Sequence, residues 1–194
     1  MPPTISTPNV LTDPGFLWIA PLATVAPTNT VTAGKFSDTI AAAWIPLGAT
    51  SEGSTFAYSS TVEPIRVAEL RDPVKYVTTE RSGNIAFNLA NWTLSNYRRA
   101  LNGGIAALIP TGSAGSELTT LEPPEPGQEV RAMILWESTD STVRLMIRQA
   151  MQGGEVSSAF ATAPANAVIP CTFNFEVPPT GKPWTLWGAG TTRV

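Results

Sequence analysis

The chain of 194 residues contains no histidine and a single cysteine, Cys171. The absence of histidine excludes serine–histidine catalytic triads and metal sites built on imidazole. One cysteine cannot form an intramolecular disulfide, and Cys171 lies within an alternating apolar run. We therefore expect Cys171 to be a small core residue. We also expect no enzymatic activity, and hence no catalytic residue, together with no metal site and no cofactor.

Charged residues are also scarce, at 14% of the chain, against about 25% in an average soluble domain. The net charge is −3, and no segment concentrates Lys and Arg as a nucleic-acid footprint requires. A weakly charged surface is typical of a protein that is packed against neighbours. The sequence therefore favours a role in assembly and argues against tight binding of DNA or RNA.

Long apolar runs are missing as well, so the sequence predicts no segment that crosses a bilayer. The N-terminal residues Met1 to Thr4 lack the basic and apolar stretches of a secretory signal. We expect a protein that is made and kept in a cytoplasm, without a membrane partner.

What the chain does contain is a series of short alternating segments separated by turn residues. Thr50 to Thr55 is expected to form a hairpin tip between two of them. One short helix is expected after Thr93, its N-cap, with Leu94, Tyr97 and Leu101 facing the core. The predicted strands are 15–20, 44–49, 55–58, 62–70, 74–80, 84–90, 130–136, 143–148 and 169–177.

This pattern predicts a mainly β fold: two packed antiparallel sheets, as a β-sandwich or partial barrel, flanked by one short α-helix. The length predicts a single domain over residues 1–194. We expect a flexible N-terminal segment at about 1–14, a long loop at about 25–43 and a C-terminal arm at about 178–194. The Pro-rich stretch 110–127 is expected to be a further loop.

Two other functions compete with a structural role. Carboxylate pairs such as Glu63 with Glu69 have the chemistry of a glycosidase, although scattered surface carboxylates are usually solvated charges. A carbohydrate-binding β-sandwich is the second alternative, because a Trp face stacks on sugar rings. Trp184 and Trp187, among Gly and Pro in the tail, are the candidates for that contact.

Between about Trp44 and Gly104 the sequence resembles the major tail tube proteins of long, non-contractile-tailed (siphovirus-type) bacteriophages. The resemblance also includes Pro14 to Trp18. Its motifs are Trp44-Ile-Pro-Leu-Gly-Ala-Thr-Ser-Glu-Gly53, Val62-Glu-Pro-Ile-Arg-Val-Ala-Glu69 and Phe87-Asn-Leu-Ala90 leading to Thr93-Leu-Ser-Asn-Tyr97.

The resemblance implies a virion structural protein of the tail, assembled in the cytoplasm of a host bacterium. Such proteins form hexameric rings that stack into a tube around a tape measure protein. Tail terminator and distal tail proteins are the partners expected at its ends. Double-stranded DNA then passes through the tube without specific binding. A related tail-completion or capsid-surface protein is the remaining alternative within this class.

The tail tube interpretation assigns candidate residues to two surfaces. An acidic lining avoids trapping DNA, so the lumen-facing candidates are Glu63, Glu69, Asp72 and Glu80. The candidates for contact between subunits are Thr50, Ser51, Glu52, Gly53, Trp184 and Trp187.

Overall fold

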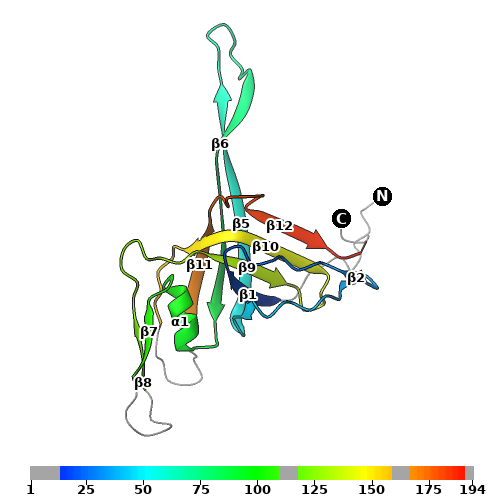
Figure 1. Ribbon diagram of the computed structural model, residues 1–194. Helices are drawn as coiled ribbons and strands as arrows, with labels where there is room; N and C mark the ends of the chain where they lie inside the picture. The colour runs from blue at the N-terminus through cyan, green and yellow to red at the C-terminus, as the bar shows by residue number, and fades with distance from the viewer. Residues whose placement is uncertain (1–13, 110–117, 159–166, 191–194) are drawn as a thin grey trace.

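The computed structural model describes residues 14–109, 118–158 and 167–190. In these ranges the protein has one large antiparallel sheet, two two-stranded sheets and one short helix, so the predicted mainly β fold is confirmed (Figure 1). The elements are β1 (Phe16–Pro21), β2 (Val31–Thr32), β3 (Lys35–Phe36), β4 (Ile45–Pro46), β5 (Thr50–Ile65), β6 (Lys75–Leu89), α1 (Leu94–Ala100), β7 (Ile105–Ile109), β8 (Leu118–Glu122), β9 (Ala132–Glu137), β10 (Val143–Gln152), β11 (Ile169–Phe175) and β12 (Trp184–Gly188).

The large sheet has the strand order β4-β1-β9-β10-β11-β6-β5, and β12 pairs with β10. It curves around a core formed by side chains of β1, β6, β9, β10, β11 and α1. The strands predicted at 130–136 and 143–148 are confirmed as β9 and β10, which pair as an antiparallel hairpin. The predicted strand at 169–177 is confirmed as β11, in which Ile169, Cys171 and Phe173 are buried. Alternation therefore located the core face of these strands, and Cys171 is a core residue.

The outer face of β1, β9 and β10 is also covered. The expected loop at 25–43 contains β2 and β3, and the segment 22–44 ends at Trp44, which packs against Met133, Leu135 and Met146. Buried Arg144 of β10 fastens this layer through Asp38, Phe36 and Asn29, whose side-chain oxygen accepts a hydrogen bond from the guanidinium at 2.8 Å, while Glu137 is its partner in β9 of the sheet. It pairs with Asp38 at 3.0 Å and Glu137 at 2.7 Å, and its guanidinium lies 4.4 Å from the Phe36 ring centroid.

The helix starts where the sequence predicts, since the Thr93 hydroxyl accepts a hydrogen bond from the Asn96 backbone N–H. Its buried face differs from the prediction, because Leu94 is 39% exposed whereas Asn96 and Ala100 are buried. Burial of Asn96 is possible because its amide donates to two backbone carbonyls, those of Leu47 and Asn91. The predicted core position of Leu94 is therefore wrong.

The C-terminal region is also more ordered than predicted. Instead of a free arm, residues 184–188 form β12, whose register pairs Trp184 with Ile147 and Leu186 with Leu145 of β10. The Trp184 ring makes edge contacts with Phe56 at 5.3 Å and Tyr58 at 5.4 Å. The expectation of a free arm is wrong for this part, while residues 191–194 lie outside the described ranges, as do residues 1–13.

The predicted loop at 110–127 is partly wrong, because β8 lies inside it and pairs with β7. Residues 110–117 lie outside the described ranges. In Figure 1 the β7–β8 pair lies at the lower side of the body, as α1 does.

The largest correction concerns residues 50–90, where four short strands were expected. The structure has two long strands, β5 and β6, that pair with each other over their whole length. Gly53, with φ of +81°, lies in an irregularity of β5 between the pairs at Thr50 and Ser54. Its left-handed conformation forms a bulge within β5 and not a turn between two strands. The predicted hairpin tip at Thr50 to Thr55 is therefore wrong. Gly83 likewise lies within β6, at a position where a side chain would collide with the Phe175 ring.

Candidate assembly surface

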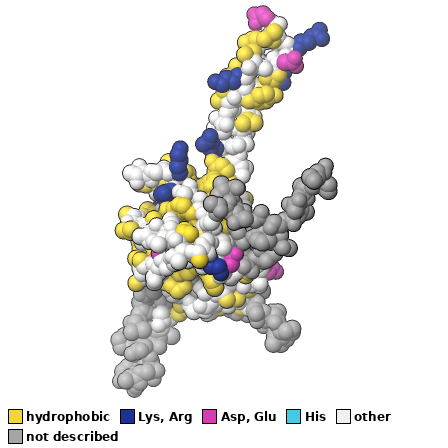
Figure 2. Space-filling view, turned by 90° about the vertical axis from the view of Figure 1, so that its right-hand side faces the viewer, with side chains coloured by type: hydrophobic (Ala, Val, Ile, Leu, Met, Phe, Trp, Pro, Cys, Tyr) yellow, Lys and Arg dark blue, Asp and Glu magenta, His cyan; other side chains and the backbone are white. Residues whose placement is uncertain are grey.

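The outer half of the β5–β6 hairpin projects from the body as a two-stranded arm, defined as residues 59–82 (Figure 1). Every arm residue is exposed except Pro73, which is half-buried. Ser59 and Ser82 face each other at its base, with their hydroxyl oxygens 2.8 Å apart. The space-filling view shows the same projection standing clear of the body (Figure 2). The arm therefore contributes nothing to the core of its own chain.

Both outer edges of the arm are unpaired in the described ranges. The strand β5 ends the sheet, and β11 pairs with β6 only from Asn84 to Leu89. The unpaired edges present rows of backbone N–H and C=O groups that can bind another strand. An isolated two-stranded hairpin is at best marginally stable in water. This geometry calls for a neighbouring protein surface.

One face of the arm continues the core side of the sheet outward. Ile85 of β6 is buried in the core and pairs with Phe56 of β5, which identifies this side. Because side chains alternate along a strand, Val62 and Pro64 lie on the same side as Phe56. The register shifts once, between the pairs of Thr61 and Val62. Beyond this shift Tyr76 pairs with Pro64, so the Tyr76 side chain lies on the same side as Val62 and Pro64. Val62 and Tyr76 are more than half exposed. These three residues, Val62, Pro64 and Tyr76, form the apolar arm face.

Sequence reasoning did not select the apolar arm face as a functional surface. Val62 and Pro64 were recognised as alternating strand residues, but alternation does not tell a buried face from an exposed one. A usable signal is the presence of apolar residues at alternate positions, Val62 and Pro64, in a segment that also carries Glu63 and Glu69. The opposite face is mixed, because the exposed apolar residues Ile65 and Val77 lie on it with Glu63.

All four lumen-facing candidates lie on the arm and are exposed. Glu63 and Glu80 share the face opposite the apolar one, while Glu69 and Asp72 lie in the turn between the strands. The same arm carries four basic residues, so its net charge is zero. In the described ranges, ion pairs occur only in the body. The basic residues of the arm are Arg66, Arg71, Lys75 and Arg81.

The structure separates the predicted contact residues into two other places. Thr50, Ser51, Glu52 and Gly53 form the irregular start of β5, at the end of the hairpin remote from the arm tip. Trp184 and Trp187 are half-buried on β12 and pack against the two core clusters. Each Trp therefore keeps only part of its side chain exposed, and sugar stacking on them stays an untested alternative.

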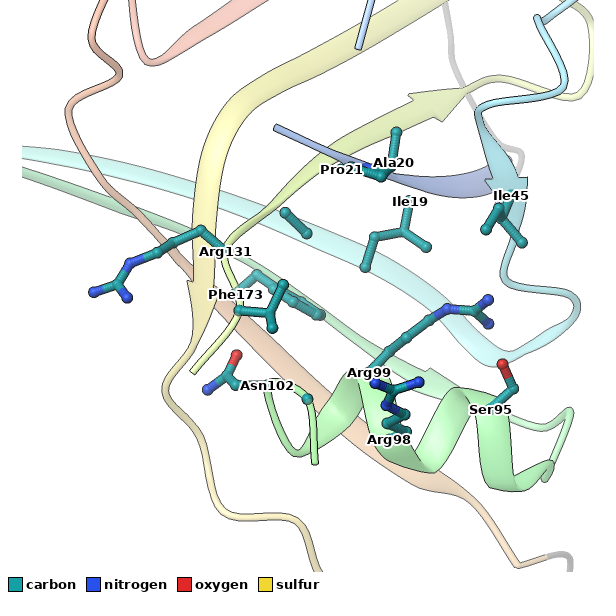
Figure 3. A pocket seen from close by; sticks show the side chains of 13 residues that line it. Ile19, Ala20, Pro21, Ile45, Ser95, Arg98, Arg99, Asn102, Arg131 and Phe173 are labelled. Atoms are coloured by element: carbon teal, nitrogen blue, oxygen red, sulfur yellow. The ribbon is translucent and has the colours of Figure 1, made fainter. Parts of the chain in front are cut away.

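A cleft of about 320 Å³ lies beside α1 (Figure 3). Its floor is apolar and includes Ile19, Ala132 and Phe173, all of them buried. Arg98 and Arg99 reach it from α1. Arg99 donates a hydrogen bond to the Asn96 side-chain oxygen at 2.7 Å. Burial, followed by the charge of Arg98, lowers the pKa of Arg99. The cleft thus combines an apolar floor with a positively charged wall.

In the ranges that the structure describes, no group of three or more Cys, Asp and Glu side chains has the geometry of a metal site. No described helix is long and apolar enough to span a bilayer. No protein-family model matches the chain, and no curated protein matches its sequence.

Proposed function

We propose that this protein is a structural subunit that polymerises with its own copies, as stacked hexameric rings, into a bacteriophage tail tube. One observation carries the proposal: the arm is a folded ribbon whose faces and edges have no partner in the described chain. A ribbon of this kind is stable when another surface covers it.

We favour identical copies as the partner that covers the arm. The unpaired edges of the arm extend the strands of the large sheet, and the apolar arm face extends the side of the sheet that faces the core. Adding a strand from a neighbour to an open edge satisfies the backbone groups in the same geometry as within the sheet. A ring of copies closes such edges without leaving a free end. Assembly thus pairs the backbone groups and buries the apolar side chains of the arm that the single chain leaves exposed.

The remaining parts of the proposal extend the resemblance to tail tube proteins. The rings enclose a tape measure protein, and terminator and distal tail proteins complete the tube. DNA then passes through the lumen. Scarce charge supports this conduit role, because a wall without a concentrated basic patch offers DNA few binding sites. Placement of Glu63, Glu69, Asp72 and Glu80 toward the lumen stays a prediction.

Shortening the arm tests the proposal. Ser59 and Ser82 are directly opposite each other, so residues 60–81 can be replaced by Asn-Gly, which forms a two-residue hairpin turn. We expect the wild type to form rings or tubes in negative-stain micrographs. The shortened variant should remain a folded monomer, with its melting temperature changed by only a few degrees. A wild-type protein that stays monomeric at high concentration, or a shortened variant that forms tubes normally, contradicts the proposal.

A pair of double variants then tests which arm face is covered. Val62→Ser with Tyr76→Ser removes apolar contact area and should reduce tube yield while leaving the unfolding of the monomer unchanged. The matched control, Glu63→Gln with Glu80→Gln, changes the opposite face of the same two strands and should leave tube yield unchanged. If only the control variant loses its tubes, the covered face is the one with Glu63 and Glu80, and the assignment of the contact to the apolar arm face is wrong.

A further inference from the structure

The cleft beside α1 has positive charge without a counterion in the described chain. Neither Arg98 nor Arg99 has a carboxylate oxygen within 4 Å in the described ranges. Arg98 donates to the Gly104 carbonyl at 2.8 Å, and the third arginine at the cleft, Arg131, is already paired with Glu176. Two guanidinium groups beside an apolar floor favour a ligand that is part apolar and part anionic.

The arm tip, residues 66–74, offers an exposed leucine and two carboxylates, although two arginines bring its net charge to zero. Leu70 is 58% exposed, and the acidic residues Glu69 and Asp72 lie close to it on the turn. The two arginines are Arg66 and Arg71. Arg66 folds back across the turn and donates to the Arg71 carbonyl at 3.4 Å. The tip therefore presents an exposed leucine with carboxylates on either side of it in the sequence.

The arm tip and the cleft lie at opposite ends of the same molecule. In Figure 1 the arm extends upward from the sheet, whereas α1 lies at the lower side of the body. Figure 2 is turned about the vertical axis and shows the arm still pointing upward. A tip therefore cannot enter the cleft of its own chain. A contact between them joins two copies and repeats in one direction, as a heterologous interface does.

We propose that the cleft beside α1 receives the arm tip of a second copy, with Leu70 over the apolar floor and Glu69 and Asp72 against Arg98 and Arg99. This inference rests on the proposed self-assembly and specifies its receiving surface. It takes Glu69 and Asp72 away from the lumen, so only Glu63 and Glu80 stay lumen-facing candidates under it. Each copy then supplies one tip and one cleft, so the contact propagates along an axis. The contact also covers the exposed leucine and neutralises the two arginines.

Cysteine cross-linking tests the contact directly. Leu70→Cys places a thiol at the tip, and Val130→Cys places one at the cleft, where Val130 is exposed. The native Cys171 stays inert, because burial raises its pKa to about 12. Under mild oxidation, the chain with both substitutions should give a ladder of covalent oligomers. The control Leu70→Cys with Val31→Cys, whose second site lies on β2, should give no ladder beyond Leu70–Leu70 dimers.

Charge exchange tests the chemistry of the contact. Reversal of the cleft, Arg98→Glu with Arg99→Glu, should raise the concentration needed for assembly at least about 10-fold, because like charges then face each other. Adding Glu69→Arg and Asp72→Arg to the same chain should restore assembly. If the cleft variant does not fold, Glu69→Arg with Asp72→Arg alone changes only the arm and should cause the same loss. Assembly unaffected by the tip reversal overturns the inference.

The two proposals fail in distinguishable ways. Suppose the wild type forms tubes that the Asn-Gly variant cannot form, yet no tip-to-cleft ladder appears and charge reversal has no effect. The cleft inference is then overturned, and self-assembly through the arm stands. If the wild type does not assemble and the chain with Leu70→Cys and Val130→Cys gives no ladder, both proposals are overturned.

Discussion

The two halves of the β5–β6 hairpin have the same strand geometry but opposite environments. At its base Ile85 is 1% exposed in the core, whereas Ile65 near the tip is 49% exposed. Both residues lie in one continuous antiparallel ladder. Strand pairing therefore accounts for the shape of the hairpin, while burial stabilises only its base.

This difference shows where the free energy of folding originates. Side chains at the base exchange water for packed neighbours, a gain of about 25 cal/mol per Å² of apolar surface. Those of the arm gain almost nothing until another surface covers them. Substitutions in the body should therefore change unfolding, and substitutions in the arm should change association.

The largest effect is expected in the layer that Arg144 fastens to the body. Arg144→Ala leaves the carboxylates of Asp38 and Glu137 without their buried partner, which should lower the free energy of unfolding by about 4 kcal/mol. Denaturant unfolding monitored by Trp fluorescence measures the change. As a control, Lys35→Ala alters an exposed charge in the same layer and should change stability by less than about 0.5 kcal/mol. Equal effects would contradict the anchoring role of Arg144.

The paired isoleucines give the next largest effect and test the comparison itself. Ile85→Ala should cost about 3 kcal/mol in unfolding, because it leaves a cavity in the core. Ile65→Ala should cost less than about 0.5 kcal/mol, since its side chain is already half in water. The measurement is the same denaturant titration on both variants. Similar losses for the two substitutions would break the distinction between base and arm.

Trp184 tests whether β12 belongs to the body. Its half-buried ring contacts Phe56 and Tyr58, so Trp184→Ala should lower the free energy of unfolding by about 2 kcal/mol. Leu186→Ala, at a position of the same strand that is 56% exposed, serves as the control and should have a smaller effect. A stable Trp184→Ala monomer that has lost assembly instead would place this strand with the arm.

The smallest effect concerns the surface of the body, at Glu176. Hydrogen bonds from the Gln149 amide and Arg131 hold the pKa of this carboxyl below its ordinary value. A lowered folded-state pKa adds stability above the ordinary carboxyl value, and that stability disappears as pH falls through the folded value. Glu176→Gln should thus cost about 0.5 kcal/mol at pH 7, and this cost should disappear in acid, once the carboxyl is protonated in the folded state as well. Urea titrations at pH 7 and in acid check this, and a difference that persists in acid contradicts it.

Particular residues show how far the sequence predicted the fold. Alternation correctly identified β9, β10 and β11, and Thr93 correctly marked the helix start. The helix face was missed at Leu94, because burial of Asn96 depends in part on the Leu47 carbonyl, which is remote in sequence. The candidate cleft was also missed, since its residues come from separate elements that meet only in the folded chain.

By itself the sequence determined the class of the fold and the ends of several elements, because alternation and capping are local properties of neighbouring residues. Only the tertiary structure decided that Gly53 and Gly83 continue strands instead of ending them. The role of such a glycine depends on what packs beside it, here the Phe175 ring at Gly83. The tertiary structure also decided that one half of a continuous hairpin is buried and the other is not, because burial depends on which distant residues are brought near.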